Sequence, residues 1–223
     1  AMYTDRTPPE PMLVDGLLGA QQILLLSGAP KVGKTFLTAQ LAVCAALGKP
    51  FLGMEIGEPL RVLHIQYEMS EDAMRQRFQM QKLTAKEVEA IRGRYCITSK
   101  KTSDYLTLEY QERIKASLTF APDIIIIDPL INAFVGDENS AGDMSAFIHK
   151  MKAFCAGLAP DASIVLTHHS SKAGQIRGSS ALRGFYDAGL TLTHVDGSPG
   201  VVNLTGEYRH REAGSSMHLR LVD

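Results

Sequence analysis

The sequence predicts an α/β domain with a mainly parallel central sheet, and three observations lead to this fold class. Four short, continuous apolar runs are typical of strands buried on both faces, as in a parallel sheet. Helical patterns lie between these runs, which indicates alternation of strands and helices. After Gly189 the pattern changes to short alternating runs separated by glycines, which predicts antiparallel strands added at the C-terminal edge of the sheet.

The expected central strands are the four apolar runs, and the expected edge strands are the three alternating runs. The former are ILLL, VLHI, IIII and IVL, at residues 23–26, 62–65, 124–127 and 164–166. The latter are LTLTHV, VVNLTG and SSMHLRLV, at residues 190–195, 201–206 and 215–222.

Three helices are expected from capping residues and apolar spacing. Residues 34–47 are apolar nearly all round, so we expect a buried central helix. Ser70 is a good N-cap for a second helix that runs to about residue 83, because acidic residues occupy its first turn. Residues 143–158 carry apolar side chains at i, i+3, i+4 and i+7 spacing, which makes this the clearest helix.

Length and composition indicate one globular domain. The 223 residues are 45% hydrophobic, which is enough for a sizeable core. Residues 1–12 include a proline-rich stretch and are expected to form an extended lead-in, whereas residues 13–223 form the domain. The formal net charge of -1 argues against a protein that coats nucleic acid through bulk positive charge, although it does not exclude a local basic lining.

Cysteine usage and hydropathy point to the cytoplasm. Cys44, Cys96 and Cys155 are far apart and follow no metal-binding spacing, so we expect three reduced cysteines in the core. No apolar run approaches the roughly 18 residues that a membrane span needs, and no signal-peptide pattern opens the chain. We therefore expect a cytoplasmic protein without a membrane partner.

A phosphate-binding loop is the strongest motif. Residues 28–35, GAPKVGKT, match GxxxxGK[ST] between an expected strand and an expected helix. Backbone N–H groups of such a loop point at phosphate oxygens, and the helix N-terminus adds positive charge. Lys34 is expected to reach the β- and γ-phosphates, and Thr35 to ligate Mg²⁺. The expected nucleotide-binding residues are Gly28, Ala29, Pro30, Lys31, Val32, Gly33, Lys34, Thr35 and Phe36.

Two carboxylates complete the expected ATP site. Asp128 ends the IIII run, so it is placed at the carboxyl end of a central strand, where it can support Mg²⁺. Glu68 follows the VLHI strand by two residues, in HIQYEMS. From that position Glu68 either deprotonates the attacking water or simply starts the next helix, and position alone does not decide between these roles.

Over nearly its whole length the chain resembles the RecA-like P-loop ATPases, and among them the RepA-type hexameric replicative helicases. The matching segments are PMLVDGLLGAQQILLLSGAPKVGKT, YEMSED, IIIIDPL and LTHHSSK…RGSS. The resemblance implies ATP and Mg²⁺ as cofactors and a homo-oligomeric, hexameric ring that acts on single-stranded DNA. It also implies that Glu68 is the catalytic base. Residues 207–211, EYRHR, match no family position securely.

The adjacent residues His168 and His169 are open to three interpretations from the residues alone. A metal site is disfavoured because three or four ligands are needed and no partners lie nearby in the sequence. A histidine acting as base for a nucleophilic serine is disfavoured because no oxyanion motif is present. The family resemblance implies instead that the pair senses the γ-phosphate, and we favour His169 for this role, with the other histidine packed under the following loop.

The segment after the histidines is cationic and rich in glycine. Lys172, Arg177 and Arg183 are candidates for contact with DNA in the channel of a ring, although cationic loops are usually just solvated. The resemblance also implies an arginine finger in RGSS, which is Arg177, donated to the neighbouring subunit. Such a residue accelerates hydrolysis about 10³–10⁵-fold. Arg209 and Arg211 are the alternative fingers.

Three functions are compatible with these features. The first is an ATP-driven DNA motor, a replicative helicase or translocase of a plasmid, phage or mobile element. The second is a RecA-like recombination or repair ATPase that forms filaments on single-stranded DNA. The third is an ATP-dependent switch without motor activity, whose histidine loop binds a protein. The absence of an evident extra domain favours a ring slightly over a filament.

Overall fold

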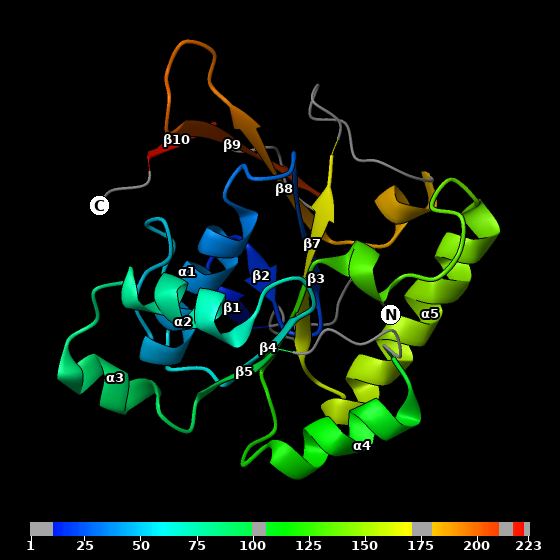
Figure 1. Ribbon diagram of the computed structural model, residues 1–223, viewed down its shortest axis with the longest axis horizontal. Coiled ribbons are helices and arrows are strands. Elements are labelled where there is room, and N and C mark those ends of the chain that lie inside the picture. The colour runs from blue at the N-terminus through cyan, green and yellow to red at the C-terminus, as the bar shows by residue number, and fades with distance from the viewer. Residues whose placement is uncertain (1–10, 100–105, 171–179, 210–215, 221–223) are drawn as a thin grey trace, which may run out of the picture.

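The described part of the protein is built around an eight-stranded sheet with strand order β10-β9-β8-β3-β7-β6-β4-β5 (Figure 1). The computed structural model describes residues 11–99, 106–170, 180–209 and 216–220. The strands are β3 (Ile23–Gly28), β4 (Val62–Gln66), β5 (Tyr95–Ser99), β6 (Ile124–Asp128), β7 (Ser163–His169), β8 (Ala188–His194), β9 (Val201–Tyr208) and β10 (Met217–Arg220). A small antiparallel pair, β1 (Met12–Val14) and β2 (Leu18–Gly19), precedes them; β1 begins at the last residue of the expected lead-in.

Helices cover both faces of the sheet. Figure 1 shows α1 (Lys34–Leu47), α2 (Glu71–Gln79) and α3 (Ala85–Ile91) on one side, with α4 (Leu108–Ser117) and α5 (Ala141–Leu158) on the other. Two 3₁₀ turns, η1 (Leu130–Ala133) and η2 (Ser180–Gly184), complete the described elements. None of the described helices combines the length and the apolar character that crossing a membrane requires.

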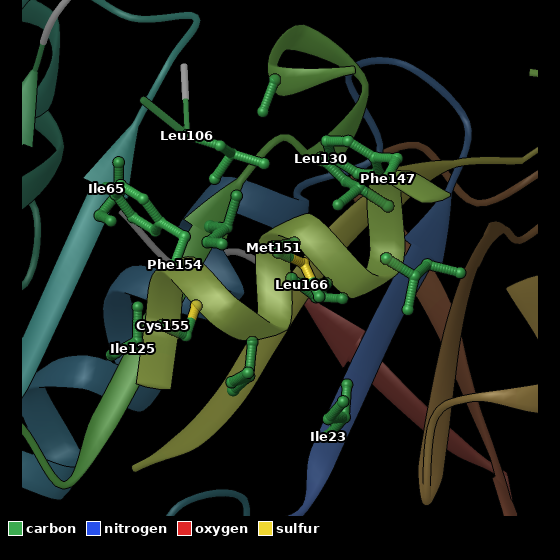
Figure 2. Packing of buried hydrophobic residues seen from close by; sticks show 14 of the residues in the cluster. Ile23, Ile65, Leu106, Ile125, Leu130, Phe147, Met151, Phe154, Cys155 and Leu166 are labelled. Carbon is green, nitrogen blue, oxygen red and sulfur yellow. The ribbon is translucent and has the colours of Figure 1, made fainter. Parts of the chain in front are cut away.

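The sheet divides the apolar core in two, and the alternation of side chains decides which face each residue joins. Ile124 and Ile126 of β6 belong to the cluster beneath α1, whereas Ile125 and Ile127 belong to the cluster beneath α4 and α5. Figure 2 shows residues of α5 packed over the central strands in this second cluster. By the same alternation Asp128 lies on the α1 face.

The expected strands and helices are present, with longer strands than the apolar runs alone indicate. α1 has the predicted bounds, and α5 begins two residues earlier than expected. Ser70 caps α2 as predicted, accepting a hydrogen bond from the Ala73 N–H. The expected end of α2 at residue 83 is wrong. The helix stops at Gln79 because Lys82 has a positive φ of 50° and Thr84 then caps α3.

The expectation that all three C-terminal strands are antiparallel is wrong for β8. β8 runs parallel to β3, because η2 lies between β7 and β8 and the chain re-enters the sheet in the same direction. β9 and β10 are antiparallel additions, as predicted. β5, α3 and α4 were not predicted. Of the three free cysteines only Cys155 is fully buried; Cys44 and Cys96 are half-buried at the edges of the two clusters.

Candidate active site

The phosphate loop connects β3 to α1 at the carboxyl edge of the parallel strands. A Cβ at Gly28 would lie 2.7 Å from Val32 Cγ1 and 2.9 Å from the Leu192 carbonyl oxygen, so only glycine fits there without a shift. Gly33 has a φ of 106°, which side-chain-bearing residues rarely adopt, and it is the N-cap of α1. The two glycines let the chain turn tightly into the helix and leave backbone N–H groups at its N-terminus.

The Lys34 ammonium lies against the loop itself. Nζ donates to the carbonyl oxygens of Gly28 at 2.8 Å and Ala29 at 3.0 Å, and lies 3.4 Å from Nδ1 of His169. Burial lowers the pKa of Lys34, and the carboxylates of Asp128 and Glu68 oppose this shift. Lys34, Glu68 and Asp128 are therefore neighbours, although they come from three different segments of the chain.

Asp128 is buried among polar groups contributed by three elements. The Thr167 hydroxyl of β7 donates to Oδ1 at 2.5 Å, and the Gln66 amide of β4 donates to Oδ2 at 3.1 Å. The Thr38 hydroxyl of α1 lies 3.5 Å from Oδ2, and Nε2 of His64 lies 3.7 Å from the same oxygen. A buried carboxylate needs such partners, because an isolated buried charge is unfavourable by several kcal/mol or more.

These partners keep Asp128 ionised. Burial alone raises the pKa of this carboxyl, but His64, through its charge and a side-chain hydrogen bond, and the hydroxyls of Thr167 and Thr35 outweigh burial, so the pKa is lowered. His64 is itself held by the neighbouring strand, since its Nδ1 lies 3.1 Å from the Tyr95 hydroxyl. The result is a fixed anion at the end of β6, directly beside the start of α1.

Glu68 lies in the turn between β4 and α2, on the α1 face of the sheet by alternation from Val62. Its side chain is exposed, and its backbone N–H donates to Oε1 of Gln66 at 2.7 Å. The Met69 N–H reaches the same oxygen at 3.3 Å. The carboxylate is thus open to solvent at a place where the backbone that carries it is hydrogen-bonded.

Arg77 of α2 is a neighbour of this site that was not predicted. Its guanidinium carbon lies 4.5 Å from the centroid of the Phe36 ring, next to the phosphate loop. Burial lowers the pKa of Arg77, and Asp128 and Glu68 oppose this shift, as they do for Lys34. Two cations from α1 and α2 therefore face the same two carboxylates.

The two histidines point to opposite faces of the sheet. Both lie within β7, which extends past the expected strand end at Leu166–Thr167. Thr167 contacts Asp128 and His169 contacts Lys34, so these two side chains share the α1 face. His168 is fully buried and falls by alternation on the other face, with Leu166. The geometry brings His169, and not His168, to the phosphate loop.

Arg183 and Arg209 lie at the opposite edge of the sheet. Tyr208, the residue before Arg209, pairs with Ala188 at the start of β8, far from the phosphate loop in strand register. The Arg209 guanidinium donates to the carbonyl oxygens of Gly184 at 2.7 Å and Tyr186 at 3.0 Å. Arg183 and Arg209 line one hollow of about 240 Å³. Three other candidates, Lys172, Arg177 and Arg211, lie outside the described residues.

The donor set fits Mg²⁺. This ion prefers oxygen ligands and is usually held in proteins by one or two carboxylates together with phosphates and water. Thr35 offers a hydroxyl and Asp128 an ionised carboxylate next to the phosphate loop. Within the described ranges, no group of three or more His, Cys, Asp or Glu side chains is arranged to hold a metal. An ion shared with a nucleotide requires no such group.

Comparisons with known proteins agree with this architecture. The sequence model of the AAA_25 family, described as an AAA domain, matches residues 2–175. Among solved structures, the ATPase domain of a helicase superposes with a TM-score of 0.61 at 13% identity, covering 90% of this chain and 81% of that chain. No curated protein matches the sequence significantly. With a phosphate loop, a buried strand-end aspartate and a mainly parallel sheet in place, the chain belongs to the AAA_25 family of AAA domains and has the fold of a RecA-like P-loop ATPase.

Proposed function

We propose that the protein hydrolyses ATP to drive movement on DNA, as a ring-forming replicative helicase or translocase of a plasmid, phage or mobile element. One observation carries the proposal of hydrolysis: Lys34, Asp128 and Glu68 meet at the carboxyl edge of the sheet. The resemblance of the histidine and RGSS segments to RepA-type helicases supports the assignment to DNA.

The proposed chemistry assigns a separate task to each residue. Backbone N–H groups of the loop and the Lys34 ammonium hold the β- and γ-phosphates. Thr35 and Asp128 hold Mg²⁺, which when bound neutralises charge on the phosphate oxygens. Glu68 accepts a proton from water as the water oxygen bonds to the γ-phosphorus, and the bond from that phosphorus to the bridging oxygen breaks. The products are ADP and phosphate.

The contact between Lys34 and His169 supports a sensing role for His169. Nζ of Lys34 now shares its hydrogen-bonding capacity between the loop carbonyls and Nδ1 of His169. A phosphate group that attracts this ammonium changes its distance to His169, and His169 is the last residue of β7. The chain that follows β7 carries Lys172 and Arg177, so nucleotide state is coupled to the segment proposed to contact DNA.

The positions of the arginines support an oligomer. Arg209 lies at the sheet edge opposite its own phosphate loop, so it can serve only the site of another subunit. Its hydrogen bonds to Gly184 and Tyr186 would have to break first, which favours Arg177 among the candidate fingers. A finger supplied in trans requires catalysis by assembled subunits, and a hexameric ring is the assembly that the family resemblance implies.

Two substitutions test the proposed site. Lys34→Ala is expected to abolish binding of a fluorescent ATP analogue, because the charge that neutralises the phosphates is lost. Glu68→Gln is expected to bind the analogue like the wild type but to lose most ATP turnover, because an amide does not accept the proton. Robust turnover by Glu68→Gln would remove Glu68 from the role of base.

The two other candidate functions are separated by further outcomes. Electron micrographs with an ATP analogue and single-stranded DNA distinguish closed rings from filaments, and filaments would favour a recombination or repair ATPase. ATP turnover that single-stranded DNA leaves unchanged would favour a switch that binds a protein partner.

A further inference from the structure

Gln66 is a fully buried amide that joins three parts of the active site. Its Nε2 donates to Oδ2 of Asp128 at 3.1 Å and lies 3.8 Å from the Met74 sulfur of α2. Its Oε1 accepts from the backbone N–H groups of Glu68 at 2.7 Å and Met69 at 3.3 Å. Both ends of the amide are therefore used.

The orientation of this amide is determined by its partners. An ionised carboxylate only accepts hydrogen bonds, so Asp128 requires the NH₂ end of Gln66. Backbone N–H groups only donate, so the turn at Glu68 requires the oxygen end. A rotation of the amide by 180° would break the bonds at both ends. Burial strengthens the preference, because an unpaired polar group in the interior is unfavourable by about 1–3 kcal/mol.

We propose that Gln66 is a positioning residue that fixes the backbone of Glu68 relative to Asp128. This inference rests on the proposed function, in which Glu68 is the base and Asp128 supports Mg²⁺. Glu68 is exposed and lies in a turn beyond the end of β4, where the strand ladder no longer holds it. The amide supplies the missing restraint by linking that turn to the end of β6. The contact with Met74 extends the link to α2, the helix that carries Arg77.

The consequence is a selective effect on turnover. Gln66 contacts neither the phosphate loop nor Lys34 in any hydrogen bond described above, so nucleotide affinity depends little on it. The position of the Glu68 carboxylate does depend on it, because a displaced base loses alignment with the attacking water. Loss of an outer partner of this kind typically lowers activity about 10–100-fold.

Two variants of Gln66 test this role. Gln66→Met keeps the length of the side chain and removes all its hydrogen bonds. Gln66→Asn keeps the amide but is one methylene shorter, so it cannot reach Asp128 and the Glu68 N–H together. Both variants are expected to lower kcat at least about 10-fold while KM and the affinity for a fluorescent ATP analogue change less than about 3-fold. If Gln66→Met does not fold, the same criterion applies to Gln66→Asn.

Gln111→Met is the matched control. Gln111 is another buried glutamine, and its Nε2 donates to the Phe154 carbonyl oxygen at 2.6 Å, between α4 and α5 on the other face of the sheet. Both Gln66→Met and Gln111→Met remove a buried amide and are expected to lower the melting temperature. Only the Gln66 variant is expected to lower kcat, so an equal loss of kcat in both variants would overturn the proposal.

A double variant identifies the residue through which Gln66 acts. In a Glu68→Gln background, single-turnover hydrolysis is expected to be no slower with Gln66→Met than without it, because the base is already absent. Multiplied losses, or unchanged kcat in both single variants of Gln66, would overturn the proposal while leaving the proposed function intact. Wild-type turnover by Glu68→Gln would overturn the assignment of the base and, with it, the positioning role.

Discussion

Arg77 and Lys34 share the same charged neighbours, and this local balance of charge shapes the active site. Each cation is partly buried, and the pKa of each is lowered by burial and supported by Asp128 and Glu68. Phe36 separates Arg77 from the phosphate loop by one aromatic ring. The residue after the loop threonine therefore contributes a platform for a second cation as well as apolar packing.

We predict that Arg77→Met lowers ATP turnover at least about 10-fold, because the carboxylates of Glu68 and Asp128 lose one of their two cations. Steady-state ATPase assays check this. Arg75→Met is the control from the same helix, since Arg75 is exposed and pairs with Asp72 at 3.3 Å, within the helix itself. Equal turnover by the Arg77 variant and the wild type would show that Arg77 is only a packing residue.

Sequence motifs predicted the site residues that occupy standard positions, but they did not predict the side chains that support them. The phosphate loop, Asp128 and Glu68 follow from strand–turn–helix order, and the choice of His169 over His168 agrees with the alternation of β7. His64, Gln66 and Thr167 were missed because each is one polar residue inside an apolar strand. A buried polar residue needs a partner, so this pattern was a usable signal.

Neighbouring parallel strands are also joined at the edge of the sheet away from the nucleotide site. Arg61, just before β4, donates from its backbone N–H, Nε and Nη2 to the carboxylate of Asp123, just before β6, at 2.7–3.0 Å. Burial raises the pKa of Asp123, but these hydrogen bonds and the charge of Arg61 outweigh it, so the pKa is lowered. The pair fixes the register of the two central strands where they begin.

We predict that this pair stabilises the fold above the ordinary aspartate pKa of about 3.9 and that the effect is lost as pH falls through the lower value in the folded state. Asp123→Asn is expected to lower stability by about 1 kcal/mol at pH 7, because the pair is partly exposed. Melting temperatures between pH 2 and 7 check this, and the difference from the wild type should shrink at the acid end.

Glu112→Gln is the control for this experiment, since Glu112 belongs to an exposed pair with Lys115 within α4. It is expected to change stability by no more than a few tenths of a kcal/mol. A difference between Asp123→Asn and the wild type that stays constant down to pH 2 would contradict the assignment of the pKa shift.

Continuous apolar runs predicted the strands that both helical layers cover, and they failed where burial is incomplete. β5 is an edge strand of half-buried residues, so YCITS gives no continuous apolar run. α3 was missed although Thr84 and Glu87 form a capping box, which is visible in the sequence. The direction of β8 was not predictable from its pattern, because burial on both faces occurs in parallel and antiparallel strands alike.

At the scale of the whole molecule, the nucleotide site and the described arginine candidates occupy opposite edges of one sheet. The phosphate loop, Glu68 and Asp128 lie at the carboxyl edge, and Arg183 and Arg209 lie at the amino edge. Such an arrangement suits head-to-tail assembly, in which one surface of a subunit meets a different surface of the next. It is the reason for expecting that the assembled protein is the active form.

The rate of ATP hydrolysis per subunit, measured across protein concentrations with and without single-stranded DNA, tests the central claim most directly. The account predicts that the rate per subunit rises with protein concentration as subunits assemble and rises further with DNA. A rate per subunit that is the same at high dilution as at high concentration, and that DNA does not change, would contradict it.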